Sequence, residues 1–202
     1  MRILLVADPQ IQGNLHEGPW GFVRRWDADR YLAKTFSWAN SAYSPNLVVF
    51  LGDLLDEGSE ADEDDYAEYV QRFKSIYGLT PDDLAKCAAA GSGVQAGGLL
   101  KDSCQTVFLP GDNDIGGEGI DPVTVPKVKR FNQNFPSKSK YHFESKNVTL
   151  DVIPVSALLQ HVTAPAAGQD DFAFKDVVPK NKQANEVRIV ISHFPVIPMD
   201  IG

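Results

Sequence analysis

Acidic and amide side chains and one histidine follow the apolar segments of this chain. Asp8 and Gln10 come after the first segment, Asp53 after the second, Asp112 after the third and His193 after the last. Carboxylate oxygens with one imidazole suit Mn, Mg or Fe, and Zn is also possible. Several carboxylates held together repel one another unless a cation neutralises them. If the fold brings these residues together, they form a metal centre.

The segments that precede these residues are short, apolar and bounded by turn-forming residues, which is typical of buried strands. They are Ile3–Ala7, Leu47–Leu51, Thr106–Leu109 and Val187–Ile191. Apolar residues at helical spacing follow the first two segments, over Asp27–Tyr43 and Tyr66–Tyr77. This alternation predicts an α/β fold with a layered sheet, in which ligands bind beyond the carboxyl ends of the strands. One acidic strand end often only caps a helix or starts a turn, but four in succession favour a site.

The rest of the chain is less regular, and we treat residues 1–202 as one domain. Residues 78–101 are rich in Gly and Ala with little periodicity, which predicts an inserted excursion or surface loop. Tyr141–Glu144 and Val148–Val155 flank a short polar turn, which predicts an antiparallel hairpin added to the sheet. His142 and His161 lie in and after this hairpin, where we expect structural roles.

Composition bounds the function classes. The 202 residues are 43% hydrophobic and carry a net charge of −8, which is typical of a globular chain without the basic footprint of nucleic-acid binding. Seven of the acids lie between Asp56 and Asp65, which predicts a solvated loop and a helix start. No stretch approaches the roughly 20 apolar residues of a membrane span. Cys87 and Cys104 lack the spacing of a zinc motif, so a disulfide and two free thiols both stay open.

The ordered blocks resemble those of the calcineurin-like metallophosphoesterases, whose signature runs D-x-H, G-D-x-x-D, G-N-H-D/E, G-H-x-x and G-H-x-H. Here the blocks read A-D-P-Q, G-D-L-L-D-E-G, P-G-D-N-D-I-G and S-H-F-P. They look most similar to the eukaryotic branch that trims ethanolamine-phosphate from glycosylphosphatidylinositol anchors, and to its fungal cell-division relatives. The resemblance implies a layered α-β-β-α sandwich and, by analogy, an ER or Golgi membrane location.

The resemblance also implies a role for each matching residue. Asp8 and Gln10 would bind a first divalent ion, Asp112 and His193 a second, and Asp53 would bridge the two. Manganese is the expected metal, with Fe, Zn or Mg as alternatives. Two dications about 3.5–4 Å apart activate a hydroxide and stabilise phosphoryl displacement. The implied substrate is a phosphodiester, such as the ethanolamine-phosphate of a glycolipid.

Several positions depart from the family pattern. Gln10 replaces a histidine and leaves a weaker amide ligand, and Asp112 replaces an asparagine and adds charge. Asn113 stands where the family has the histidine that protonates the leaving group, and Asn cannot titrate near neutral pH. Asp114, which would orient that histidine, is then left with nothing to orient. His16 is the candidate replacement acid, because its loop could reach over the site.

The G-H-x-H block does not occur before Gly202. We therefore expect that the domain is incomplete at its C-terminus and that the sheet lacks its last strands. Two functions stay open. One is a dinuclear metal-dependent phosphodiesterase, and the other is an impaired module that binds a lipid head group or a protein. A nuclease of the same superfamily is disfavoured by the acidic charge.

Overall fold

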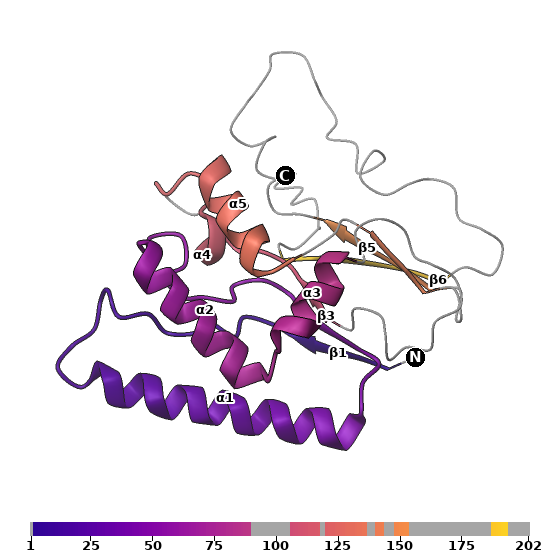
Figure 1. Cartoon of the computed structure of the whole chain (residues 1–202), viewed down its shortest axis with the longest axis horizontal. Coiled ribbons are helices and arrows are strands. Elements are labelled where there is room, and N and C mark those ends of the chain that lie inside the picture. Colours follow the sequence, from indigo (N-terminus) through magenta and orange to yellow (C-terminus); the bar gives the residue numbers. More distant parts are fainter. Residues whose placement is uncertain are drawn as a thin grey trace, which may run out of the picture.

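A computed structural model describes residues 2–89, 106–117, 120–136, 140–143, 148–153 and 187–193 (Figure 1). In chain order the elements are β1 (Ile3–Val6), α1 (Gly21–Tyr43), β2 (Leu47–Phe50), α2 (Glu63–Tyr77), α3 (Pro81–Ala89), β3 (Thr106–Phe108), α4 (Asp112–Ile115), α5 (Val125–Asn134), β4 (Lys140–Phe143), β5 (Val148–Ile153) and β6 (Val187–Ser192). The predicted α/β class and the predicted strands are confirmed.

The strands form two sheets. In the first, β1, β2 and β3 are parallel, with Val6 opposite Phe50 and Phe50 opposite Phe108. In the second, β4 and β5 are the predicted antiparallel hairpin, and β6 runs parallel to β5. The prediction that the hairpin is added to the first sheet is wrong, because β4 and β5 form a separate sheet with β6. The predicted histidine therefore arrives at the site from a different sheet than the acids.

The two faces of the first sheet meet different layers. On one face, Phe50 and Phe108 pack against buried residues of α2 and α5 and against partly buried residues of α1. On the other face, Val49 and Val107 pack against Ile191 of β6. Side chains of successive strand residues point to opposite faces, so the alternating residues of β2 and β3 serve both layers. The described part of the chain is thus layered as helices, first sheet and second sheet.

Aromatic rings fill the layer between the helices and the first sheet. The Phe50 ring stacks on Phe108, with centroids 5.4 Å apart, and meets Phe73 and Tyr77 edge-on at 5.1 and 4.8 Å. Such pairs contribute about 0.5–1.5 kcal/mol beyond the area that they bury. This core fixes β2 and β3 against α2, and so fixes the loops that follow both strands.

Three helices differ from their predicted bounds. Helix α1 begins six residues before the predicted Asp27, because its first turn has neither a side-chain cap nor an acid to mark it. Helix α2 begins at Glu63, three residues early, after the Asp62 cap. Helix α3 lies inside the segment predicted as an irregular excursion, and residues 90–101 of that segment lie outside the described residues.

Helix α3 is started by local hydrogen bonds. The Thr80 backbone N–H and hydroxyl both donate to Asp83, and the Asp83 N–H donates back to the Thr80 hydroxyl. Pro81 at the first helical position fits this start. Cys87 in the same helix is buried and disulfide-bonded, while Cys104 lies outside the described residues. None of the helices described is both long and apolar enough to cross a bilayer.

The start of α2 gives a test of the fold. The Asp62 carboxylate accepts hydrogen bonds from the backbone N–H groups of Asp64 and Asp65, at 3.0 and 2.9 Å. Asp62→Ala removes this cap and should lower the free energy of unfolding by about 0.5–2 kcal/mol, measured by urea denaturation. Asp64→Ala is the control, since it removes a first-turn carboxylate and keeps the cap. Equal effects of the two substitutions would contradict the capping role.

Candidate metal centre

The acids of the site leave the first sheet at one edge. The parallel strands end in register, and the pairing continues past them as Leu51 N–H donates to Val6 and Leu109 N–H donates to Phe50. Gln10 N–H then donates to the Asp53 carbonyl at 2.9 Å, which ties the loop after β1 to the loop after β2. Asp8, Asp53 and Asp112 are thereby carried to the same place.

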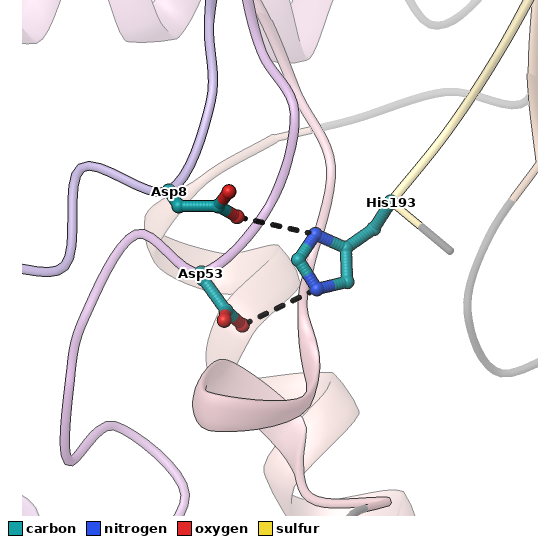
Figure 2. Close-up of side chains that lie close together, drawn as sticks. All are labelled: Asp8, Asp53 and His193. Carbon is teal, nitrogen blue, oxygen red and sulfur yellow. Dashed lines mark ion pairs between the residues drawn. The ribbon is translucent and has the colours of Figure 1, made fainter. Parts of the chain in front are cut away.

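His193 reaches these acids from the second sheet, directly after β6. Its Nε2 lies 3.1 Å from Asp112 Oδ1 and 3.5 Å from Asp53 Oδ1, and its Nδ1 lies 3.9 Å from Asp8 Oδ1. Figure 2 shows the side chains of Asp8 and Asp53 on the same side of the imidazole, each pointing toward one of its nitrogens. Ligand atoms of these three residues all lie within 4.8 Å of one another.

The His193 ring is oriented by the backbone. Its Nδ1 lies 2.9 Å from the Leu51 carbonyl, which can only accept, so Nδ1 carries a hydrogen and Nε2 faces Asp53 and Asp112. Burial opposes the charged imidazolium, but the Leu51 carbonyl and the carboxylates of Asp53 and Asp112 outweigh it and raise the pKa of His193. A metal ligand histidine is commonly held in this way through its second nitrogen.

Asp53 is the most enclosed acid of this group, with 7% of its surface exposed. Its Oδ1 accepts from the Asn113 backbone N–H at 3.1 Å, and its Oδ2 is approached by Asn113 Nδ2 at 3.3 Å and Gln10 Nε2 at 3.4 Å. Burial raises the pKa of Asp53, the neighbouring Asp112 raises it further, and His193 opposes both. A carboxylate in this position is stabilised by a cation beside it.

The backbone at the site is held in an uncommon conformation. Asp8, Gln10 and Asp53 have φ of +45°, +40° and +50°, in the left-handed region that non-glycine residues rarely adopt. Each such residue costs on the order of 1–3 kcal/mol and persists where the surrounding structure enforces it. Three predicted ligands share this conformation, which indicates that side-chain placement at the site is maintained against a local cost.

Two glycines make room for the candidate ligands. A Cβ on Gly52, whose φ is +107°, would lie 2.4 Å from His193 Nδ1. A Cβ on Gly111 would lie 2.0 Å from Asp53 Oδ1 and 2.4 Å from the Asp53 backbone nitrogen. Both contacts are far closer than atoms tolerate, so these positions require glycine.

Asp114 holds the loops together. Its carboxylate, in a residue only 1% exposed, accepts from the backbone N–H groups of Leu54, Leu55 and Gly111 at 3.1, 3.0 and 2.9 Å. The expectation that Asp114 has nothing to orient is therefore wrong, because it orients the backbone on both sides of the site. Burial raises the pKa of Asp114 to about 7, although the three N–H donors act to lower it.

His16 lies apart from this group in the contacts that the structure gives it. Its ring Nε2 is 3.4 Å from Glu60 and its side chain is 76% exposed. Glu57, which sequence reasoning missed, holds the same loop, since its carboxylate accepts from the backbone N–H groups of Leu15 and His16. A lone Glu in an acidic run carries no pattern that would have identified it.

The donor set fits divalent cations. Carboxylates of Asp8, Asp53 and Asp112 and the imidazole of His193 lie together, and Gln10 contacts Asp53 beside them. Oxygen-rich sets with an imidazole suit Mn, Fe, Mg or Zn. The ligand roles of these residues stay predictions. The side chain of His142, and the whole of His161, lie outside the described residues.

A family profile and several known proteins match this chain, and their names agree. The profile described as Calcineurin-like phosphoesterase matches residues 1–200. The chain is 32% identical over 83 residues to "Metallophosphoesterase 1 homolog" of Drosophila melanogaster, covering 40% of this chain and 21% of that protein. It is 29% identical over 133 residues to the protein of the same name from Caenorhabditis elegans, covering 64% and 29%. It is 27% identical over 160 residues to "Metallophosphoesterase 1" of Danio rerio, covering 78% and 35%. The chain thus spans about a fifth to a third of the length of these relatives.

The close approach at Gly111 gives a test of the site. Gly111→Ala should displace the Asp53 carboxylate and weaken Mn²⁺ binding at least about tenfold, measured by calorimetric titration. Gly18→Ala is the matched control, since no atom lies within 4 Å of a Cβ built there. Unchanged Mn²⁺ affinity in folded Gly111→Ala protein would contradict the placement of Asp53 as a ligand.

Proposed function

Because the chain belongs to the calcineurin-like phosphoesterase family, we propose that it is a metal-dependent phosphoesterase that hydrolyses a phosphodiester with two divalent cations. The observation that carries the proposal is the meeting of Asp8, Asp53 and His193 within 4.8 Å, from two sheets. The donor types and the family agree on the same chemistry. The proposal concerns the activity of the whole protein, because the chain covers only part of each relative that it matches.

Each candidate ligand has a place in this proposal. Asp8 and Gln10 would hold the first cation, Asp112 and His193 the second, and Asp53 would lie between the two. When bound, the cations supply Lewis-acid catalysis of phosphoryl transfer. The Leu51 carbonyl holds His193 with Nε2 toward Asp53 and Asp112.

The proposed substrate is the ethanolamine-phosphate of a glycosylphosphatidylinositol glycolipid, and the proposed metal is manganese. Support comes from the A-D-P-Q and G-D-L-L-D-E-G blocks and from relatives that carry the name Metallophosphoesterase 1. The disulfide at Cys87 fits an oxidising compartment, such as the lumen of the ER or Golgi. We propose this secretory location together with the substrate.

One observation favours a second candidate function, an impaired module that binds a lipid head group or a protein. Asn113 stands at the position of the family's general acid, and it donates from both its backbone N–H and its side-chain amide to Asp53. An amide cannot release a proton near neutral pH. If no other group supplies the proton, the site would keep its metals with little turnover of poor leaving groups.

Metal titration tests the cation sites. The second position has an imidazole and a carboxylate whose side chains are 10% and 12% exposed, while the first relies on the 57% exposed Asp8 and a neutral amide. We expect the 202-residue chain to show at most one Mn²⁺ site of appreciable affinity by calorimetry, because buried charged ligands bind a dication more tightly. Asp53→Asn should abolish that site, whereas Asp82→Asn, on the exposed start of α3, should leave it unchanged. Two equally tight sites would contradict this asymmetry.

The leaving group tests the role of Asn113. Without a general acid, a nitrophenyl phosphodiester should be hydrolysed far faster than an alkyl phosphodiester, because only the alkoxide needs a proton as it leaves. Asn113→His should raise kcat/KM for the alkyl substrate selectively, by up to about 10²-fold. The measurement is the ratio of kcat/KM for the two substrates before and after the substitution.

Asn113→Ala is the control, since it removes the amide contact to Asp53 without adding an imidazole. It should lower kcat/KM for both substrates together. An unchanged ratio in Asn113→His would contradict the missing-acid interpretation, and loss of alkyl hydrolysis in His16→Ala would then identify His16 as the acid. Binding of Mn²⁺ with no turnover of either substrate would favour the impaired module.

A further inference from the structure

The three tryptophans of the chain all lie on α1 or at its N-cap, and all are exposed. Trp20, Trp26 and Trp38 keep 73%, 57% and 69% of their surface exposed, and Tyr31 on the same helix keeps 69%. Large aromatic residues usually bury most of their surface. Their common location on one helix therefore indicates that this helix presents a binding surface.

Basic side chains lie between these aromatic rings. The outer face of α1, as we define it, consists of residues at helical spacing: Trp20, Arg24, Asp27, Tyr31, Lys34 and Trp38. Arg30 lies beside this face with its guanidinium 4.5 Å from the centroid of the Trp26 ring. The chain has a net charge of −8, so a face on which basic residues outnumber the one acid differs from the chain as a whole.

The opposite side of α1 is already occupied. Leu32 and Phe36 pack on the core, and Asp29 accepts two hydrogen bonds from Arg72 of α2 at 3.0 and 2.9 Å. Figure 1 shows α1 along the outside of the molecule, with α2 between it and helices α4 and α5. The outer face extends about 27 Å from Trp20 to Trp38 at 1.5 Å per residue.

We propose that the outer face of α1 docks on an anionic phospholipid bilayer, with the helix lying in the plane of the interface. Tryptophan and tyrosine favour the interface between headgroups and acyl chains, and Arg and Lys reach the lipid phosphates. Trp, Tyr and Arg are also enriched in protein interfaces, but the centre of such an interface is depleted of charged residues. On this face a charged residue separates each aromatic residue from the next. The proposal is independent of the proposed hydrolysis, because it requires neither metal nor turnover.

Intrinsic fluorescence tests the docking, because two of the three tryptophans, Trp20 and Trp38, lie on the outer face and Trp26 lies elsewhere on the same helix. We expect vesicles of phosphatidylcholine with 30% phosphatidylserine to shift the emission of the 202-residue protein to the blue. The shift should be much smaller with phosphatidylcholine alone, and it should decrease as salt is raised, because the attraction to the surface is screened. The measurement is made in EDTA, so it is separate from any activity.

Two pairs of substitutions locate the contact. Tyr31→Ser with Trp38→Ser removes aromatic rings, and Arg24→Glu with Lys34→Glu reverses charge. Each pair should weaken vesicle co-flotation at least about tenfold. All four positions are exposed, and circular dichroism checks that the variants fold. The controls are Ile120→Ser and Lys129→Glu, which change exposed residues away from α1 and should leave flotation unchanged.

The outcomes separate the membrane from other partners. Vesicle binding that both pairs weaken and both controls retain supports the proposal. Absence of a blue shift with 30% phosphatidylserine, or flotation that both pairs leave intact, overturns it. Self-association in gel filtration that Tyr31→Ser with Trp38→Ser abolishes, without vesicle binding, also overturns it and assigns the face to a second copy of the chain.

Discussion

A carboxylate enclosed between two sheets is the constraint on which the rest of the site depends. Asp53 is almost buried, and a buried carboxylate without partners is costly. Its carboxylate is contacted by the backbone and side-chain N–H groups of Asn113, by the amide of Gln10 and by the imidazole of His193. These partners come from the segments after β1, β3 and β6, and Asp53 itself follows β2. Satisfying one acid therefore orders four loops, and the same order places Asp8 and Asp112 beside it.

Packing between the sheets sets how far His193 can reach. Val49 and Val107 of the first sheet pack on Ile191 of β6, two residues before the histidine. The His193 Nδ1–H then donates to the Leu51 carbonyl. The residue is thus held both by the packing of β6 and by a hydrogen bond to its ring. A cavity in this apolar layer would be expected to move the imidazole relative to Asp53 without touching either residue. The position of the imidazole at the site thus depends on the packing of the core between the two sheets.

The sequence predicts the strands and the residues at their ends because both follow local rules. Short apolar runs mark buried strands, and the loops beyond them carry the polar residues. The α-β-β-α sandwich implied by the resemblance includes a second sheet, but the residue pattern could not assign β6 to it, since an apolar run does not say which neighbour it pairs with. Nor could the role of Asp114, because its three partners are backbone N–H groups, which carry no side-chain identity. The positive φ values of Asp8, Gln10 and Asp53 were equally hidden, since none is a glycine.

The misplaced start of α1 has a physical cause that bears on function. Periodicity identifies a helix by contrast between an apolar face and a polar face. Over the first turns of α1 the large apolar residues Phe22, Val23 and Trp26 are all exposed, at 61%, 42% and 57%, so no buried apolar face contrasts with a polar one. A helix whose only role was to cover the sheet would show charged residues in place of those rings. Exposed apolar side chains thus hide the start of the helix, and Tyr31 and Trp38 of the outer face continue the same feature, which packing within the described part of the domain does not explain.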